Sequence, residues 1–261
     1  MKWNPQEYAQ HSANQLAWAR QLFARMGLRG SESILDIGSG DGKVSAELGR
    51  LVPHGSVLAV DTSREFLDYA PRHFPATEFP NLEFRYMDAR RIACDRQFDL
   101  IFSNAALHWV DDHRAVLRGC ARVLRAGGRL FFSFGGAGNA SEVIRSMDEL
   151  IAQPPWQRYF HDFTFPYYFY GPDQYRPWLA EAGLHPTRVE LVEKDMVHNG
   201  VAGLAGCFRA TWLPYTQHLP EALQEQFISA NVNHYLDKCP LDPAGQAHVR
   251  MVRLEVEALK P

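Results

Sequence analysis

Short apolar segments alternate with amphipathic segments in the first half of the chain. Five of the apolar segments have the length of a buried strand and end at glycine or polar residues: 33–38, 56–61, 82–88, 98–104 and 129–135. The segments between them place apolar residues three or four positions apart and predict helices: 43–52, 63–74 and 113–128. Strands that alternate with helices in this way form a parallel sheet with helices on both faces.

The pattern changes on either side of this region. Residues 5–26 carry apolar side chains at helical spacing and predict one long helix before the first strand. Beyond residue 136 the sequence predicts three more helices and two more strands: helices at 141–152, 171–184 and 219–236, and strands at 187–197 and 249–259. The chain therefore predicts a Rossmann-like α/β fold, with a seven-stranded, mostly parallel sheet and a helical cap from two insertions.

The predicted elements divide the chain into six consecutive parts. We expect the two insertions to pack together as one cap. The parts are an N-terminal helical lid (1–30), a cofactor-binding core (31–136), a first cap insertion (137–171), a continuation of the core (172–198), a second cap insertion (199–247) and a last core strand (248–261).

The turn after the first predicted strand, "DIGSGDG", is the most informative stretch. Gly38 and Gly40 let the backbone turn tightly and let a ligand approach main-chain atoms. In an open α/β sheet, ligands bind at the carboxyl ends of the strands, beside the first strand. The dinucleotide fingerprint needs glycine or alanine where this chain has Lys43, and no phosphate-binding G-K-[ST] sequence follows. The turn has instead the pattern Asp36-x-Gly38-x-Gly40-x-Gly42, which fits either a different ligand or a tight strand-to-helix turn that holds none.

Polar residues end the next three predicted strands. Asp61 ends the second strand, where a carboxylate can accept hydrogen bonds from two ribose hydroxyls. Asp88 ends the third strand, where an acid can accept the amino group of adenine, and Ala89 follows it. Ser103 and Asn104 end the fourth strand. A ligand that contains a nucleoside explains this order of strand ends better than packing does.

Composition and charge exclude several classes of partner. The net charge of -3 and the lack of a basic patch argue against nucleic acid. No run of about 18 apolar residues predicts a membrane span. The four cysteines are scattered, which indicates free thiols in a reducing cytoplasm rather than disulfides, and the eleven histidines show no metal-ligand spacing. We expect a cytoplasmic protein that binds a small molecule and no metal, membrane or nucleic acid.

As a set, "DIGSGDG", "VDTS", "MDA", "FDLIFSNAALHW" and "RVLRAGG" resemble the ordered motifs of the class I S-adenosylmethionine-dependent methyltransferases. The resemblance covers residues 31–135 closely and implies S-adenosylmethionine as the cofactor. It also implies a role for each motif residue. The residues concerned are Asp36, Gly38 and Gly40 at the amino-acid part of the cofactor, Asp61 at the ribose, Thr62, Asp88 and Ala89 at the adenine, and Asn104 along the methionine part.

The stretches "YAQHSANQLAW" and "NAALHW" resemble a narrower group of small-molecule carboxyl methyltransferases. That group includes the juvenile hormone acid, trans-aconitate and malonyl-acyl-carrier-protein methyltransferases. Its Tyr-x3-Ser-x2-Gln pattern lines the site, and Tyr8, Ser12 and Gln15 match this pattern. The resemblance implies that Gln15 and Trp109 hold the carboxylate of the acceptor.

The chemistry of methyl transfer agrees with a carboxylate acceptor. A carboxylate is already ionised at neutral pH and needs no general base. The transfer is an in-line displacement, so orientation and exclusion of water supply most of the rate. Neutral donors such as a glutamine amide and an indole N–H can hold one oxygen while the other attacks. His108 could instead act as the general base for a hydroxyl acceptor.

Residues 156–170 contain nine aromatic residues in fifteen positions. They could form the core of the cap, or they could line an apolar acceptor pocket, with Trp156, Phe160 and Tyr168 as its candidates. The sequence favours an enzyme that O-methylates the carboxylate of a small, largely apolar metabolite. Two alternatives stay open: a methyltransferase that acts on a hydroxyl, phenol, nitrogen or carbon, and a cofactor-binding protein without turnover.

Overall fold

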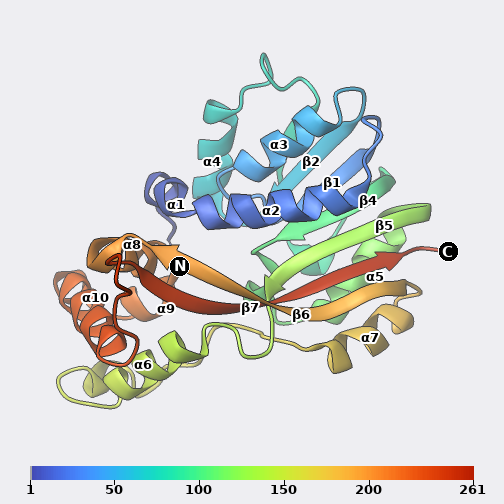
Figure 1. The fold of residues 1–261 in the computed structure, drawn as a ribbon. Coiled ribbons are helices and arrows are strands. Elements are labelled where there is room, and N and C mark those ends of the chain that lie inside the picture. Colours follow the sequence, from blue (N-terminus) through green and yellow to red (C-terminus); the bar gives the residue numbers. More distant parts are fainter. Residues whose placement is uncertain (1) are drawn as a thin grey trace. The chain divides into compact units, whose positions relative to one another are not determined.

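The computed structural model describes residues 2–261, except for the side chain of His11. Seven strands form one sheet in the order β3-β2-β1-β4-β5-β7-β6 (Figure 1). The pairs from β3 to β5 are parallel, and β7 is antiparallel to β5. This confirms the predicted seven-stranded, mostly parallel sheet. The strands are β1 (Ser33–Ile37), β2 (Ser56–Asp61), β3 (Leu82–Tyr86), β4 (Phe98–Asn104), β5 (Leu124–Gly135), β6 (His185–His198) and β7 (Ala247–Leu259).

The chain divides into two compact units. The first, which we call the core unit, consists of residues 12–137, 167–192 and 253–261. The second, which we call the helical unit, consists of the described residues up to His11 together with 138–166 and 193–252. The helical unit thus joins the segment before Ser12 to both predicted insertions.

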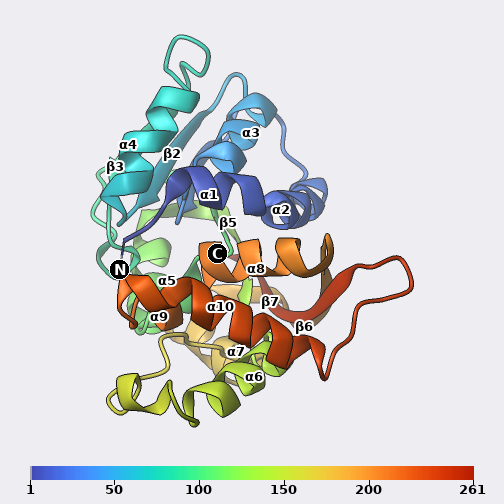
Figure 2. The same ribbon diagram turned by 90° about the vertical axis from the view of Figure 1, so that its left-hand side faces the viewer.

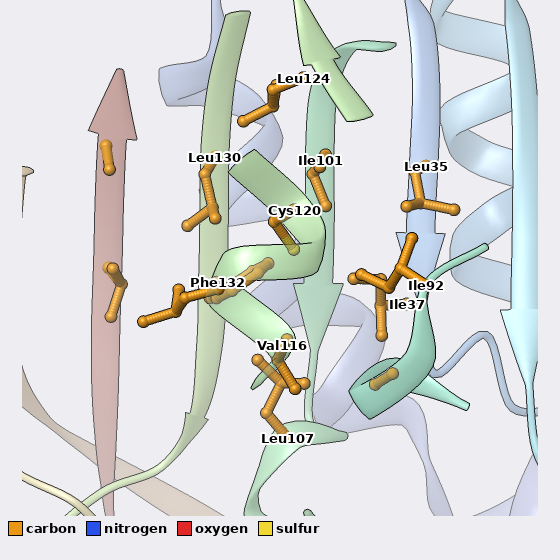
Figure 3. Close-up of a cluster of buried hydrophobic side chains, with 14 of the residues drawn as sticks. Leu35, Ile37, Ile92, Ile101, Leu107, Val116, Cys120, Leu124, Leu130 and Phe132 are labelled. Carbon is orange, nitrogen blue, oxygen red and sulfur yellow. The ribbon is translucent and has the colours of Figure 1, made fainter. Parts of the chain in front are cut away.

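Apolar side chains of the core unit pack on both faces of the sheet. One cluster joins the sheet to α5 (His113–Val123) and α7 (Pro172–Glu181). Figure 3 shows Val116 and Cys120 of α5 directed toward strand residues of this cluster, which include Ile101. A second cluster joins the other face to α2 (Ala13–Met26) and α3 (Lys43–Leu51). Each fully buried aliphatic side chain contributes about 1.5–3 kcal/mol, so the two clusters fix the sheet that carries the strand ends.

The N-terminal segment is two helices rather than the single predicted helix. The first, α1, spans Pro5–His11, and α2 begins at Ala13. Ser12 lies between them, and its hydroxyl accepts a hydrogen bond of 2.6 Å from Lys43 Nζ. This partner lies 31 residues away in the sequence, so local periodicity contains no sign of the contact at the break. The boundary between the two units falls at the same point.

The helix predicted over residues 113–128 is also shorter than expected. Helix α5 ends at Val123, and the chain enters β5 at Leu124. Backbone hydrogen bonds then pair Gly127 and Gly128 with Lys260 near the end of the chain. Long-range pairing of the strand therefore replaced the last helical turn that the local pattern predicted.

The helical unit is built on α6 (Ser141–Ile151), α8 (Gly200–Thr211) and α10 (Glu221–Leu236), and α10 packs against the other two (Figure 2). Helix α1 packs on α8. The remaining helical elements are α4 (Arg64–His73), η1 (Ala89–Arg91), η2 (Leu107–Trp109), η3 (Gln157–Tyr159) and α9 (Leu213–Thr216).

Candidate functional site

The glycine turn after β1 folds closely against the next strands. The backbone N–H groups of Gly38 and Ser39 both donate to the carbonyl of Val60, at 2.8 and 3.0 Å. Gly38 has a φ of 79°, and a Cβ added there would overlap the Cβ of Ala106. The turn therefore requires glycine for both its backbone conformation and its packing.

Asp61 at the end of β2 organises this turn. Its carboxylate accepts a hydrogen bond of 2.9 Å from the N–H of Gly40 and another of 2.9 Å from the N–H of Ser63. Burial raises the pKa of Asp61 against the opposing effect of these backbone donors. The structure thus brings Gly40, which is predicted at the amino-acid part of the cofactor, to Asp61 and Thr62, which are predicted at the ribose and the adenine.

Asp36 lies beneath the turn. It is 2% exposed and accepts a hydrogen bond of 2.6 Å from the hydroxyl of Ser45. Burial, with the nearby charge of Asp61 as a smaller cause, raises the pKa of Asp36 to about 7. Asp36 therefore connects the end of β1 to the first turn of α3 through this hydrogen bond.

Asp88 and Ala89 follow the neighbouring strand β3. Asp88 caps η1 through the N–H of Arg90, and the guanidinium of Arg90 contacts the same carboxylate at 2.7 Å. This arginine is the main reason that the pKa of Asp88 is lowered. Ala89 is buried. An adenine amino group bound by Asp88 would therefore share its carboxylate with Arg90.

Asn104 connects the end of β4 to helix α2. Its side-chain N–H donates a hydrogen bond of 2.9 Å to the backbone carbonyl of Gln15. The predicted cofactor residue and the predicted acceptor residue are thus joined directly. The amide oxygen Oε1 of Gln15 is buried and has no hydrogen-bond partner, and the same is true of the hydroxyl of Ser39. Because buried polar atoms are normally paired, these two atoms fit a site that a polar ligand completes.

Ser12 lies at the start of α2, beside the glycine turn. It is buried, and its hydroxyl lies between Lys43 Nζ at 2.6 Å and Asp41 at 3.4 Å. Lys43 and Asp41 also form an ion pair of 2.9 Å. These three residues attach the start of α2 to the glycine turn. Tyr8 lies on α1 in the helical unit, where its ring packs edge-on against Trp3.

His108 and Trp109 lie together on η2, between β4 and α5. The N–H of Gly135 donates to His108 Nδ1 at 3.3 Å, so the proton of the neutral ring is on Nε2. Burial, with the charges of Arg253 and His113 as smaller causes, lowers the pKa of His108 to about 3. The ring of Trp109 packs against Tyr167 with centroids 4.6 Å apart. Helix η2 therefore presents a neutral indole and a weakly basic imidazole.

The three aromatic residues predicted for the acceptor pocket fall in different units. Tyr168 is in the core unit and 37% exposed, and its N–H donates to the carbonyl of His108. Trp156 and Phe160 are in the helical unit, where both rings pack on Phe227 at 5.2 and 5.6 Å. These two rings form the core of the helical unit, and a role for them in acceptor binding stays a prediction.

Arg253 is a residue near the site that the sequence analysis missed. It lies on β7 and is 2% exposed, with its guanidinium bonded to Ser133 and Asn104. In the sequence it alternates with apolar residues and continues as Glu255 and Glu257, a pattern typical of a solvated strand face. The missing information was that α2 covers this face, where Arg25 bonds both glutamates.

Three further findings concern metals, thiols and membranes. Within residues 2–261, no group of three His, Cys, Asp or Glu side chains is arranged to hold a metal ion. All four cysteines are free thiols. No helix in this range combines the length and the apolar character that a membrane crossing needs.

Comparisons with known proteins show which proteins the chain is similar to. Residues 35–132 match the family model described as a methyltransferase domain. The chain is 29% identical over 201 residues to an uncharacterized methyltransferase of Schizosaccharomyces pombe, with 76% of each chain covered. It is 26% identical over 259 residues to the trans-aconitate 2-methyltransferase of Shigella flexneri, with 98% of this chain and 97% of the relative covered.

Solved structures with the same fold agree. A candidate methyltransferase from Bacillus halodurans superposes with a TM-score of 0.64 at 18% identity, over 94% of this chain and 99% of the other. The geranyl diphosphate C-methyltransferase of Streptomyces coelicolor, solved with S-adenosylhomocysteine, gives a TM-score of 0.55 at 16% identity, over 94% and 80%. At these identities the solved structures show that the fold is shared and nothing more specific.

Residues 35–132 therefore form a methyltransferase domain, and the relatives that match along the chain make it an S-adenosylmethionine-dependent methyltransferase, with S-adenosylmethionine as its cofactor. Among known proteins it is similar to the trans-aconitate 2-methyltransferases. The relative from Deinococcus radiodurans is 37% identical over 130 residues, which are 50% of this chain and 48% of that protein.

Proposed function

We propose that the protein methylates a carboxylate oxygen of a small, largely apolar acid in the cytoplasm, with Gln15 and Trp109 orienting the carboxylate. The observation that carries this proposal is that His108 is poorly placed to act as a base, because its Nδ1 already accepts the backbone N–H of Gly135. His108 is the basic side chain of η2, and its pKa is lowered to about 3. An acceptor that needs no base fits these residues best.

The proposed roles follow from the hydrogen-bonding capacity of each side chain. Asp61 would accept the ribose hydroxyls, and the turn at Gly38 and Gly40 would contact the amino-acid part of the cofactor. S-adenosylmethionine supplies an electrophilic methyl group on a positively charged sulfur. A carboxylate oxygen oriented by Gln15 and Trp109 would receive this methyl group, and the electron pair of the S–CH3 bond would remain on sulfur. No proton moves in this step.

Gln15 and Trp109 would act by orientation. An amide N–H and an indole N–H are neutral donors, so they can hold a carboxylate without withdrawing its charge as a guanidinium in direct contact would. Gln15 is fixed at its backbone by Asn104, and Trp109 at its ring by Tyr167. Rigid placement of this kind accounts for most of the rate of an in-line displacement.

A hydroxyl or phenol acceptor is the second candidate, with His108 as its base. The neutral tautomer of His108 donates through Nε2, and Nδ1 already accepts the N–H of Gly135. A base in this state could take a proton only after its hydrogen bonding changed. This arrangement favours the carboxylate over the hydroxyl.

The pH dependence of turnover separates these candidates. A carboxylate acceptor has a pKa of about 4, so its kcat is expected to stay constant between pH 6 and pH 9. A hydroxyl or phenol acceptor would give a kcat that rises with pH in this range, because its proton must be removed. The acceptors to offer are fatty, isoprenoid and aromatic acids beside phenols and alcohols, at saturating S-adenosylmethionine.

A further inference from the structure

A buried arginine lies at the acceptor end of the sheet. Arg253 stands opposite Gly135 in the antiparallel pair of β5 and β7, which places it where β5 ends. It is 2% exposed. The backbone N–H of the same Gly135 bonds to His108. The position therefore belongs to the β4–β5 side of the sheet, away from β2 and β3, which carry the predicted ribose and adenine residues.

The contacts of Arg253 connect it to the proposed carboxylate clamp. Its guanidinium donates to the carbonyl of Ser133 at 2.5 Å and to the side-chain oxygen of Asn104 at 3.4 Å. It also lies over the ring of Trp18, 5.2 Å from the centroid. Asn104 in turn donates to the carbonyl of Gln15. The side chain of Asn104 therefore links the guanidinium of Arg253 to the backbone of Gln15.

The positive charge of Arg253 acts on the neighbouring side chains at this end of the site, including His108. A charge in a low-dielectric interior acts over longer distances than one in water, and salt screens it less. His108 shows this effect, because the positive charge of Arg253 contributes to the lowering of its pKa. The field that disfavours a protonated imidazole favours an anion at the same place.

Acidic side chains further along the strand have their own cations. Glu255 contacts Arg25 at 2.7 Å and Arg188 at 3.5 Å, and Glu257 contacts Arg25 at 2.9 Å. Arg253 stands at the end of this row of charges, nearest to Asn104 and Ser133.

We infer that Arg253 determines the charge selectivity of the acceptor site: its buried guanidinium draws the anionic acceptor to the clamp of Gln15 and Trp109 and disfavours neutral molecules of the same shape. The inference rests on the proposed function, because it assumes that the acceptor is a carboxylate. Arg253 acts through its field, so the carboxylate keeps its nucleophilicity while neutral donors hold it.

The test compares an acid with its neutral ester in protein saturated with S-adenosylhomocysteine. Calorimetry would measure binding of a small aromatic acid, benzoate, and of its methyl ester to the wild type, Arg253→Gln, Arg253→Lys and Arg188→Gln. We expect Arg253→Gln to weaken binding of the acid by roughly 10-fold or more, as for the loss of a charged partner, and to leave the ester unchanged. Arg253→Lys should retain most of the preference for the acid, and Arg188→Gln should match the wild type.

Several outcomes overturn the inference. Equal weakening of the acid and the ester in Arg253→Gln would mean that the arginine merely supports the fold around Asn104. Loss of S-adenosylhomocysteine affinity with an unchanged ratio of acid to ester would assign Arg253 to the carboxylate of the cofactor. A wild type that does not prefer the acid would also contradict it. Failure of the proposed function is a separate result, since it would appear as acid binding that depends on Arg253 without formation of a methyl ester.

Discussion

The side-chain amide of Asn104 donates a hydrogen bond of 2.9 Å to the backbone carbonyl of Gln15. This bond joins the end of the central strand β4 to the start of helix α2, and so joins a predicted cofactor residue to a predicted acceptor residue. In-line transfer needs the two reactants to be held in one geometry. A direct bond between the two sets of residues meets that need within the core unit.

Asp61 is expected to be essential for cofactor binding. The change Asp61→Asn should reduce the affinity for S-adenosylhomocysteine by roughly 100-fold or more, because two ribose hydroxyls lose a charged acceptor. Calorimetry measures this directly. Asp68→Ala, at an exposed position of α4, is the matched control and should bind like the wild type. Unchanged affinity in Asp61→Asn would contradict the assigned ribose site.

Trp109 is expected to matter for turnover alone. Trp109→Phe keeps an aromatic ring against Tyr167 and removes the indole N–H, so kcat should fall by roughly 10- to 100-fold. The affinity for S-adenosylhomocysteine should not change. Trp178→Phe, whose ring packs on Tyr170, provides the control. If Trp109→Phe turns over as fast as the wild type, its indole N–H has no part in orienting the acceptor.

A substitution at Gly38 tests whether the close contact between the glycine turn and Ala106 is important. Gly38→Ala should lower both the melting temperature and the cofactor affinity, because the new methyl group overlaps Ala106 and φ is 79°. The double change Gly38→Ala with Ala106→Gly should recover part of the loss. Gly27→Ala also has a positive φ but meets nothing within 4 Å, so it should cost only about 1 kcal/mol. Equal melting temperatures for Gly38→Ala and Gly27→Ala would show that the contact with Ala106 is unimportant.

Buried His113 is expected to make stability fall in mild acid. Its Nδ1 accepts from the hydroxyl of Tyr175 at 2.7 Å, and its Nε2 donates to the carbonyl of Leu107 at 2.9 Å. Burial lowers its pKa to about 4 from 6.5. A depressed pKa means that the folded state binds fewer protons than the unfolded state, so this contribution is present above pH 6.5 and is lost as the pH falls toward 4.

Urea unfolding at pH 7.5 and pH 5 checks this prediction. The free energy of unfolding of the wild type should decrease more between these two pH values than that of His113→Gln. Asp36, with its pKa raised to about 7, contributes with the opposite sign, because its neutral form is favoured by folding and that contribution is lost as the pH rises through 7. It is present in both proteins and cancels in the comparison. Parallel pH profiles would mean that His113 is not buried as a neutral ring.

The sheet could be predicted because each strand has a recognisable local pattern in the sequence. Segments such as 56–61 and 98–104 are apolar runs that end at a polar residue, and a strand buried on both faces requires such a run. The strand-end residues Asp61 and Asn104 followed from the same rule, since ligands bind at the carboxyl ends of parallel strands.

The features that could not be predicted depend on distant partners. Ser12 breaks the N-terminal helix through contacts with Asp41 and Lys43, which local periodicity does not contain. Arg253 looks like a solvated strand residue until α2 is placed over it. The state of His108 depends on the backbone N–H of Gly135. Each case needed the tertiary fold before the chemistry of the side chain could be stated.

The most direct test of the proposed carboxyl methylation identifies the bond that the methyl group enters. The protein would be incubated with S-adenosylmethionine that carries a labelled methyl group and with the panel of acids, phenols and alcohols, and the product treated with mild alkali. The account predicts label in an extractable product of an acid that alkali releases as methanol, the behaviour of a methyl ester. Label that resists alkali would show an ether, amine or carbon product and would contradict the proposed carboxyl methylation.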